Sequence, residues 1–248
     1  MVSSYIYKSV RRAATYGFFF AMALIAFLTY KNINGHVEYS SFQKLTFWPF
    51  TWEFFIEMVI AIEASWIILS DMVNGTYKNV VAGGVRRRNY FWCQLVCVLT
   101  MITVELVFAS FTYFYFLLRN SGLEGVPFEC LKMYGFYLLL IWARHLTIAT
   151  VCASLGFMFR KLYVMMGAIL VVFSLMFLDA ASGIRTDLAG LAKIMSYMPH
   201  ATAKVLRDQI FMGNIPVASS IINTLPTIAI AVIVVVVAMI VFEKADLN

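Results

Sequence analysis

Ionisable side chains inside long apolar runs are the residues of this chain that could do chemistry. At the centre of a bilayer a charged side chain costs about 2.5 to 3.5 kcal/mol on insertion scales, so each one needs a partner or water. At 100° per residue, Glu53, Glu57 and Glu63 share one helix face roughly 120° wide. The six residues are Glu53, Glu57, Glu63, Glu105, Arg144 and His145.

Two interpretations of these charges stay open. They line a substrate path, or they form an intramembrane ion pair that locks three helices together. Glu63, Glu105 and Arg144 lie closest to mid-span, so we expect a buried contact between Arg144 and one of these two acids. Glu53 and Glu57 lie near the outer mouth, where water can solvate them. His145 alone predicts no metal site.

The elements that position these residues follow from composition. Of 248 residues, 62% are hydrophobic and 13% are charged, more apolar surface than one soluble core can hide. A helix needs about 20 apolar residues to cross the hydrocarbon. We therefore predict an all-α polytopic membrane protein, one transmembrane domain over residues 1–248. Its six spans are expected at about 15–30, 52–70, 91–118, 133–155, 162–178 and 221–242.

Basic residues orient the spans. The run of three arginines at 86–88 and the pair Arg160 and Lys161 abut span ends, which indicates cytoplasmic loops and places both termini in the cytoplasm. The formal charge of +6 then reflects basic residues beside the spans and does not indicate nucleic-acid binding. Residues 1–14 mix basic and aromatic side chains and predict an interfacial helix. Residues 180–220 hold apolar pieces too short to cross and predict re-entrant or interfacial helices on the outer face.

The loop at 72–90 is patterned. Helix stop signals at Asn74 and Gly75 precede a short amphipathic run, TYKNVV. A break at Gly83 and Gly84 follows, then the arginines and an aromatic opening of the next span. The pattern predicts helix, short helix, turn, helix. An ordinary basic cytoplasmic loop remains the alternative.

Taken together, these residues resemble the ABC-2 type permeases, which commonly carry E/D-x-x-x-G-T-h-K-N-h-h-x-x-G-h-x-R at this place. Here the pattern stands as Asp71, Gly75, Thr76, Lys78, Asn79, Gly83 or Gly84, and Arg86 to Arg88. The resemblance covers essentially the whole chain. It includes the span count, the broken outer segment with Tyr197, Pro199 and Leu206, and an F-x-K-x-D-L ending at Phe242 to Leu247.

The resemblance implies a permease subunit, not an enzyme, with no catalytic residue of its own. A separate ATPase in two copies would bind ATP and Mg, because no G-x-x-x-x-G-K-[ST] occurs in this chain. A second permease, the same chain or a homologue, would complete the transporter. Arg86, Arg87 and Arg88 would contact lipid phosphates or the ATPase. The ATPase-coupling residues would be Thr76, Tyr77, Lys78, Asn79, Val80, Val81, Gly83, Gly84 and Val85.

Small permeases of this kind, with separate ATPases, look like those of Gram-positive bacteria that export antimicrobial or amphipathic peptides or confer immunity to them. The expected function is export of an amphipathic peptide, antimicrobial or lipid-like molecule across a bacterial plasma membrane. The resemblance leaves the direction of transport and the substrate itself undefined.

Two other functional classes are alternatives to the exporter. An ion-coupled carrier or channel would use Glu63, Glu105 and Arg144 as a relay, although inverted repeats and broken central spans are not evident. An intramembrane enzyme would need a motif such as H-E-x-x-H or G-x-S-x-G, and the sequence has neither. The four cysteines show neither a disulfide framework nor metal-ligand spacing.

Overall fold

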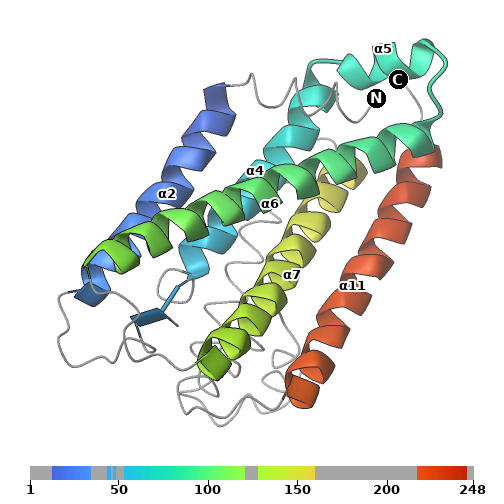
Figure 1. The fold of residues 1–248 in the computed structure, drawn as a ribbon. Coiled ribbons are helices and arrows are strands. Elements are labelled where there is room, and N and C mark those ends of the chain that lie inside the picture. The colour runs from blue at the N-terminus through green and yellow to red at the C-terminus, as the bar shows by residue number, and fades with distance from the viewer. Residues whose placement is uncertain are drawn as a thin grey trace, which may run out of the picture.

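The computed structural model describes residues 13–34, 44–45, 47–48, 53–120, 128–159 and 217–244. Within these ranges the long elements are all helices (Figure 1). No described residue is assigned to a strand. The helices are α2 (Ala13–Asn34), α4 (Glu53–Val73), α5 (Thr76–Ala82), α6 (Arg87–Asn120), α7 (Phe128–Phe159) and α11 (Val217–Lys244).

Four of these helices are long and apolar enough to cross a membrane: Ala14–Asn34, Arg87–Asn120, Tyr134–Phe159 and Thr224–Lys244. They indicate a multi-pass membrane protein. The 21-residue α4 also falls on a predicted span but carries four acids, and its crossing stays a prediction. The predicted fifth span at 162–178 lies outside the described residues. So do most of the interfacial segment at 1–14 and of the outer loop at 180–220.

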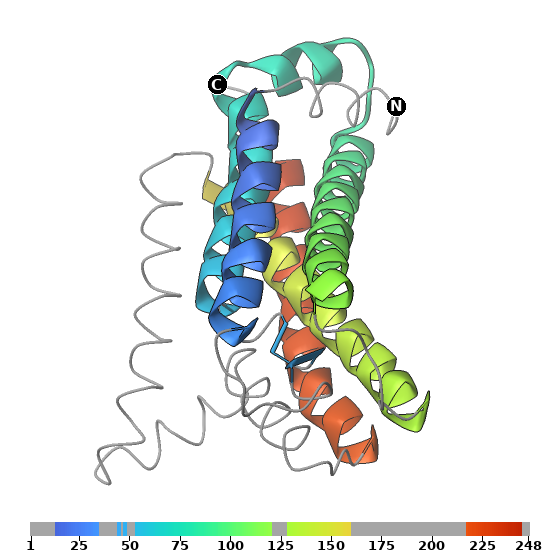
Figure 2. The same ribbon diagram turned by 60° about the vertical axis from the view of Figure 1, so that its left-hand side comes forward.

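The helices form one bundle in which α7 packs against α4, α6 and α11, while α2 packs against α6 and α4. Ring pairs between Phe19 and Phe108 and between Phe27 and Phe116 show that α2 and α6 run in the same direction, away from α5. The other three long helices run toward α5 (Figures 1 and 2). Ala13 and Lys244 therefore lie at the α5 end of the bundle.

The 34-residue α6 is longer than the apolar run that predicted it. At 1.5 Å per residue it extends roughly 51 Å, more than the hydrocarbon is thick. It runs obliquely across the other helices in Figure 1, and its first turns pack beneath α5. Tilt is one of the two expected ways for a long helix to fit a bilayer.

Seven serine and threonine side chains within the long helices donate to their own backbone. Because lipid supplies no hydrogen-bond partner, a hydroxyl in a span needs an internal acceptor, and the carbonyl four residues earlier is the nearest one. This contact is made by Thr29, Thr100, Thr103, Ser110, Thr112, Thr147 and Thr150.

The predicted order of helix, short helix, turn, helix at 72–90 is confirmed. Gly75 ends α4 at φ +66° and the seven-residue α5 follows it. At the other end, the Gly84 amide donates to the Val81 carbonyl and the Val85 amide to the Val80 carbonyl. This pair of bonds with Gly84 at φ +89° is a Schellman cap, in which a left-handed residue turns the chain out of the helix.

The two adjacent glycines give a matched test of this cap. Gly84→Ala should destabilise α5 by about 1 kcal/mol, because a Cβ is disfavoured at positive φ. Gly83 has φ −73°, and an added Cβ would meet its nearest neighbour at 3.4 Å, so Gly83→Ala should change little. Amide hydrogen exchange across residues 78–82 measures the difference. Equal exchange in the two variants would contradict the cap.

Candidate functional site

The short helix α5 presents one face to the bundle and one away from it. Tyr77 is buried, and Val80 is half-buried against the core. Lys78 and Asn79 are exposed, and Val81 is half-buried. Of the expected coupling residues, then, Lys78, Asn79, Gly83 and Gly84 are exposed and Tyr77 faces inward.

The inward face of α5 meets a cluster of rings around Phe242, near the end of α11. The Phe242 ring lies 6.4 Å from Tyr77, 6.0 Å from Tyr90 and 6.3 Å from Phe91, measured between centroids. It also lies 5.1 Å from Phe157 in α7. This aromatic cluster joins α5, α6, α7 and α11 at one point.

From the sequence alone, the simplest interpretation of Asp71 is that it marks the end of a helix. The structure gives it a further role. It is buried, and its carboxylate accepts hydrogen bonds from Gln94 Nε2 at 2.6 Å and from the Tyr90 hydroxyl at 3.4 Å. The contact ties the last turn of α4 to the first turns of α6, across the loop that carries α5. An acid at the end of one span and an amide at the start of the next were visible in the sequence, but their pairing was not.

The three arginines divide into two groups. Arg86 and Arg88 are exposed, as a contact with lipid phosphates or an ATPase would need. Arg87 Nη1 donates to the Glu243 backbone carbonyl at 2.9 Å. A cation at a helix C-terminus satisfies carbonyls that have no intrahelical partner and complements the helix dipole. Arg87 therefore holds the end of α11 beside the start of α6.

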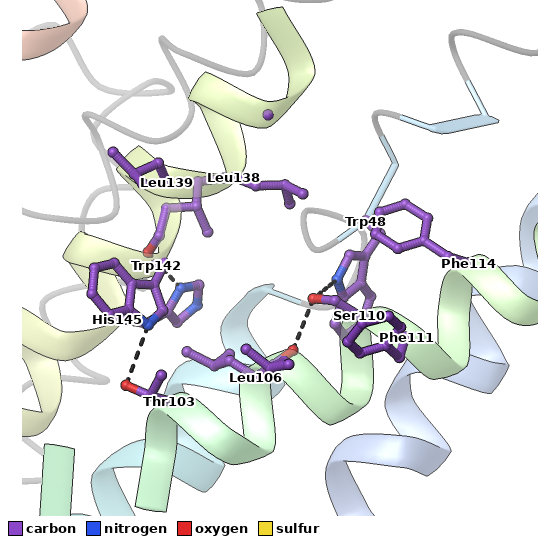
Figure 3. A pocket seen from close by; sticks show the side chains of 13 residues that line it. Trp48, Thr103, Leu106, Ser110, Phe111, Phe114, Leu138, Leu139, Trp142 and His145 are labelled. Atoms are coloured by element: carbon purple, nitrogen blue, oxygen red, sulfur yellow. Dashed lines mark hydrogen bonds between the residues drawn. The ribbon is translucent and has the colours of Figure 1, made fainter. Parts of the chain in front are cut away.

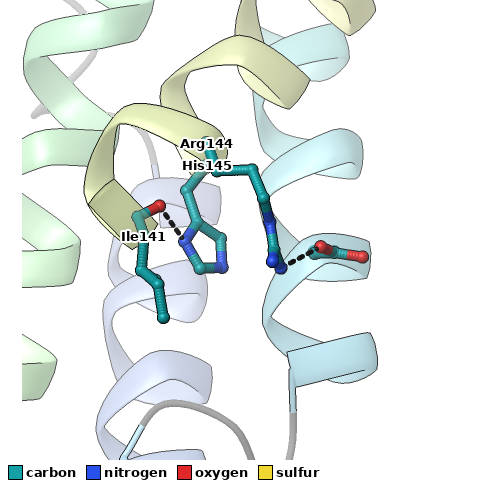
Figure 4. Close-up of polar contacts among 4 residues, drawn as sticks. Ile141, Arg144 and His145 are labelled. Atoms are coloured by element: carbon teal, nitrogen blue, oxygen red, sulfur yellow. Dashed lines mark hydrogen bonds and ion pairs between the residues drawn. The ribbon is translucent and has the colours of Figure 1, made fainter. Parts of the chain in front are cut away.

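A buried ion pair joins α4 to α7. Arg144 Nη2 lies 2.8 Å from Glu57 Oε1, and the two side chains are 4% and 5% exposed (Figure 4). The acid differs from the expected Glu63 or Glu105, and Glu57 is buried rather than solvated at a mouth. The reason is the register of two parallel helices, which local pattern does not reveal.

The same register is fixed again about three turns farther along both helices. There Gly156 of α7 lies so close to α4 that an added Cβ would be 3.3 Å from Ile68 Cγ2. The close contact and the ion pair therefore specify one alignment of α4 with α7.

Glu63 and Glu105 form a second pair, between α4 and α6. Both are fully buried, and their carboxyl groups interact with each other. Among the described residues no other hydrogen-bond donor reaches their oxygen atoms. Among the described residues, this pair therefore lacks the counter-ion that Arg144 supplies to Glu57.

His145 follows Arg144 but faces a different set of atoms. Its Nδ1 lies 2.8 Å from the Ile141 carbonyl, which can only accept, so Nδ1 carries the hydrogen (Figure 4). Its Nε2 is buried without a partner among the described residues. Within those residues no group of three histidine, cysteine or acidic side chains could hold a metal ion. Glu53 opens α4, and its side chain lies outside the described part.

Trp48 is a core residue that sequence reasoning missed. It is buried at the end of the bundle opposite α5, where its Nε1 donates to Ser110 Oγ at 3.0 Å and its rings stack on Tyr113 at 5.7 Å. The Tyr134 hydroxyl donates to the Trp48 carbonyl at 3.3 Å. The available signal was a tryptophan in a segment between two apolar runs. The sequence does not distinguish a tryptophan exposed in a loop from one whose side chain packs into the bundle.

No protein-family model, curated protein or solved structure matches this chain.

The ion pair leads to a prediction about stability. Arg144→Leu should lower the free energy of unfolding by about 3 to 5 kcal/mol, because it leaves the Glu57 carboxylate buried and unpaired. Glu57→Leu should be similarly costly. The double variant should recover much of the loss, since two apolar side chains need no partner. Thermal unfolding of the purified chain in detergent measures all three. Losses that simply add in the double variant would show that the two residues are not coupled.

Proposed function

We propose that this chain is the membrane-spanning subunit of an ATP-driven exporter of the ABC-2 permease type, powered by a separate ATPase. The observation that carries the proposal is α5, a capped short helix between two long ones, with one face on the bundle and one face open. A soluble motor can act on a membrane bundle only through a rigid element that projects from it.

The contacts of α5 suit this role. Gly75 and Gly84 set it as a separate helix between α4 and α6. Its Tyr77 contacts Phe242, so that movement of α5 reaches α11, and the Asp71 bonds carry the same movement to α4 and α6. The proposed docking surface is centred on Lys78 and Asn79, with Arg86 and Arg88 beside it.

The partners follow from the proposed class. Two ATPase subunits would bind ATP and Mg, and two permease subunits would enclose the path of an amphipathic peptide, antimicrobial or lipid-like substrate. Bacterial plasma membrane and cytoplasmic termini belong to the same proposal. The buried Glu57 and Arg144 pair serves in it as a helix lock, because each charge already has its counter-ion.

A test of coupling uses the exposed face of α5. Lys78→Glu combined with Asn79→Trp should abolish binding of the ATPase subunit and substrate-dependent ATP hydrolysis, because it reverses a charge and adds bulk at the docking surface. Arg119→Glu, an exposed charge reversal at the far end of α6, is the control and should leave both unchanged. Thermal unfolding of the permease should be the same in all variants. Full ATPase stimulation in the α5 variant would overturn the proposal.

The Glu63 and Glu105 pair favours one second candidate, an ion-coupled carrier. Buried carboxyl groups inside a membrane bundle are common in proton relays. In that case proteoliposomes holding the chain alone would move substrate along a pH gradient without nucleotide, and Glu63→Gln would abolish the movement. Transport that needs nucleotide and an added ATPase, and survives Glu63→Gln, would exclude the carrier.

A further inference from the structure

A cavity of about 540 Å³ lies between α6 and α7, toward the end of the bundle opposite α5 (Figure 3). Its volume falls within the range of about 300 to 1,000 Å³ that is typical of small-molecule sites. No residue of α5 lines the cavity, nor does any of the buried residues Glu57, Glu63, Glu105 and Arg144, and the proposed function makes no use of it.

Two tryptophan indoles and two hydroxyls in the cavity wall already have hydrogen-bond partners. Trp48 Nε1 donates to Ser110 Oγ at 3.0 Å, and Trp142 Nε1 donates to Thr103 Oγ1 at 3.3 Å. Each of these hydroxyls in turn donates to a carbonyl four residues earlier in α6. The remaining polar side chain, His145, is fully buried, and its unpartnered Nε2 exposes essentially no surface to the cavity. The wall therefore offers an occupant no accessible hydrogen-bonding group.

Water fits such a cavity poorly, because an ordered water needs two to four polar partners. An empty cavity of this size is also unfavourable, since the atoms that line it lose dispersion contacts on one side. The occupant that the wall suits is an uncharged hydrocarbon.

The rim of the cavity faces the region where hydrocarbon is available. On α6 the rim is formed by Val107 and Phe111, which are 47% and 70% exposed, and on α7 by Leu139 and Trp142, which are 58% and 37% exposed. Both helices qualify as membrane spans by length and composition. The cavity thus opens sideways between two spans, where the neighbouring medium is lipid.

Gly135 of α7 contributes to the space. It lines the cavity, and no atom lies within 4 Å of the position that a Cβ would occupy. A glycine inside a helix costs about 1 kcal/mol relative to alanine. Its missing side chain keeps this part of the wall open.

We propose that the cavity between α6 and α7 binds one acyl chain of a bilayer lipid, taken from the side. The charge and hydrogen-bonding character of the wall and the apolar rim both fit a hydrocarbon chain, and the proposal does not depend on the ATP-driven function.

The test uses the purified full chain in phosphatidylcholine vesicles, with a small share of the lipid carrying a diazirine within its acyl chain. Light releases nitrogen from the diazirine, and the resulting carbene inserts into the nearest protein bonds. Peptide mapping should find adducts on the inner wall at Ser110, Phe114 or Leu138, which are only half-buried. Their yield should exceed that at Phe20, which is 69% exposed on α2 and reports ordinary surrounding lipid.

Gly135→Leu is the decisive variant, because an added Cβ meets no atom within 4 Å and the leucine side chain would occupy the cavity. It should abolish the inner-wall adducts and leave those at Phe20. Gly17→Leu is the matched control: it also adds a side chain where nothing lies within 4 Å, but on α2, and should change neither yield. If Gly135→Leu leaves the inner-wall labelling unchanged, the adducts come from surrounding lipid only. If the parent chain shows no inner-wall labelling, protein covers the cavity. Either result would overturn the proposal.

Discussion

The constraint on which this structure depends is that a charge placed in hydrocarbon must be met by another group of the protein. Arg144 and Glu57 meet it for each other at 2.8 Å, and in doing so they fix α7 against α4. Gly156 and Ile68 hold the same alignment farther along. Because α7 also packs on α6 and α11, that one register positions most of the bundle. Seven serine and threonine hydroxyls meet the same constraint within single helices.

The α5 end is organised differently, by rings and glycines rather than by a charge pair. Two left-handed glycines make a short helix stand apart from the spans on either side. Phe242 then receives contacts from α5, α6 and α7, and Arg87 holds the backbone just after it. One end of the protein is thus a rigid junction of four helices with an open outer face. The far end holds an inserted tryptophan and an apolar cavity. This division of roles fits a protein that receives force at one end and meets lipid or an amphipathic substrate elsewhere.

Much of this could be predicted from sequence, because local pattern encodes it. Apolar run length predicted the positions of α2, α4, α6, α7 and α11, and glycine placement predicted the bounds of α5. Partner choice was not predictable. Glu57, Glu63 and Glu105 are equivalent by residue type, and only the register of α4 with its neighbours decides that one meets Arg144 while the other two meet each other. The contacts of Trp48 and Gln94 were not predictable for the same reason, since their partners lie on other helices.

The central claim, that a separate ATPase acts on this bundle through α5, is tested most directly by a photo-crosslinking amino acid at exposed position 79 in native membranes. The claim predicts a light-dependent adduct with a protein that carries a G-x-x-x-x-G-K-[ST] phosphate-binding loop and binds ATP. The same probe at exposed position 119, on the opposite end, should give no such adduct. Adducts at position 79 only with lipid or with this chain itself would contradict the claim.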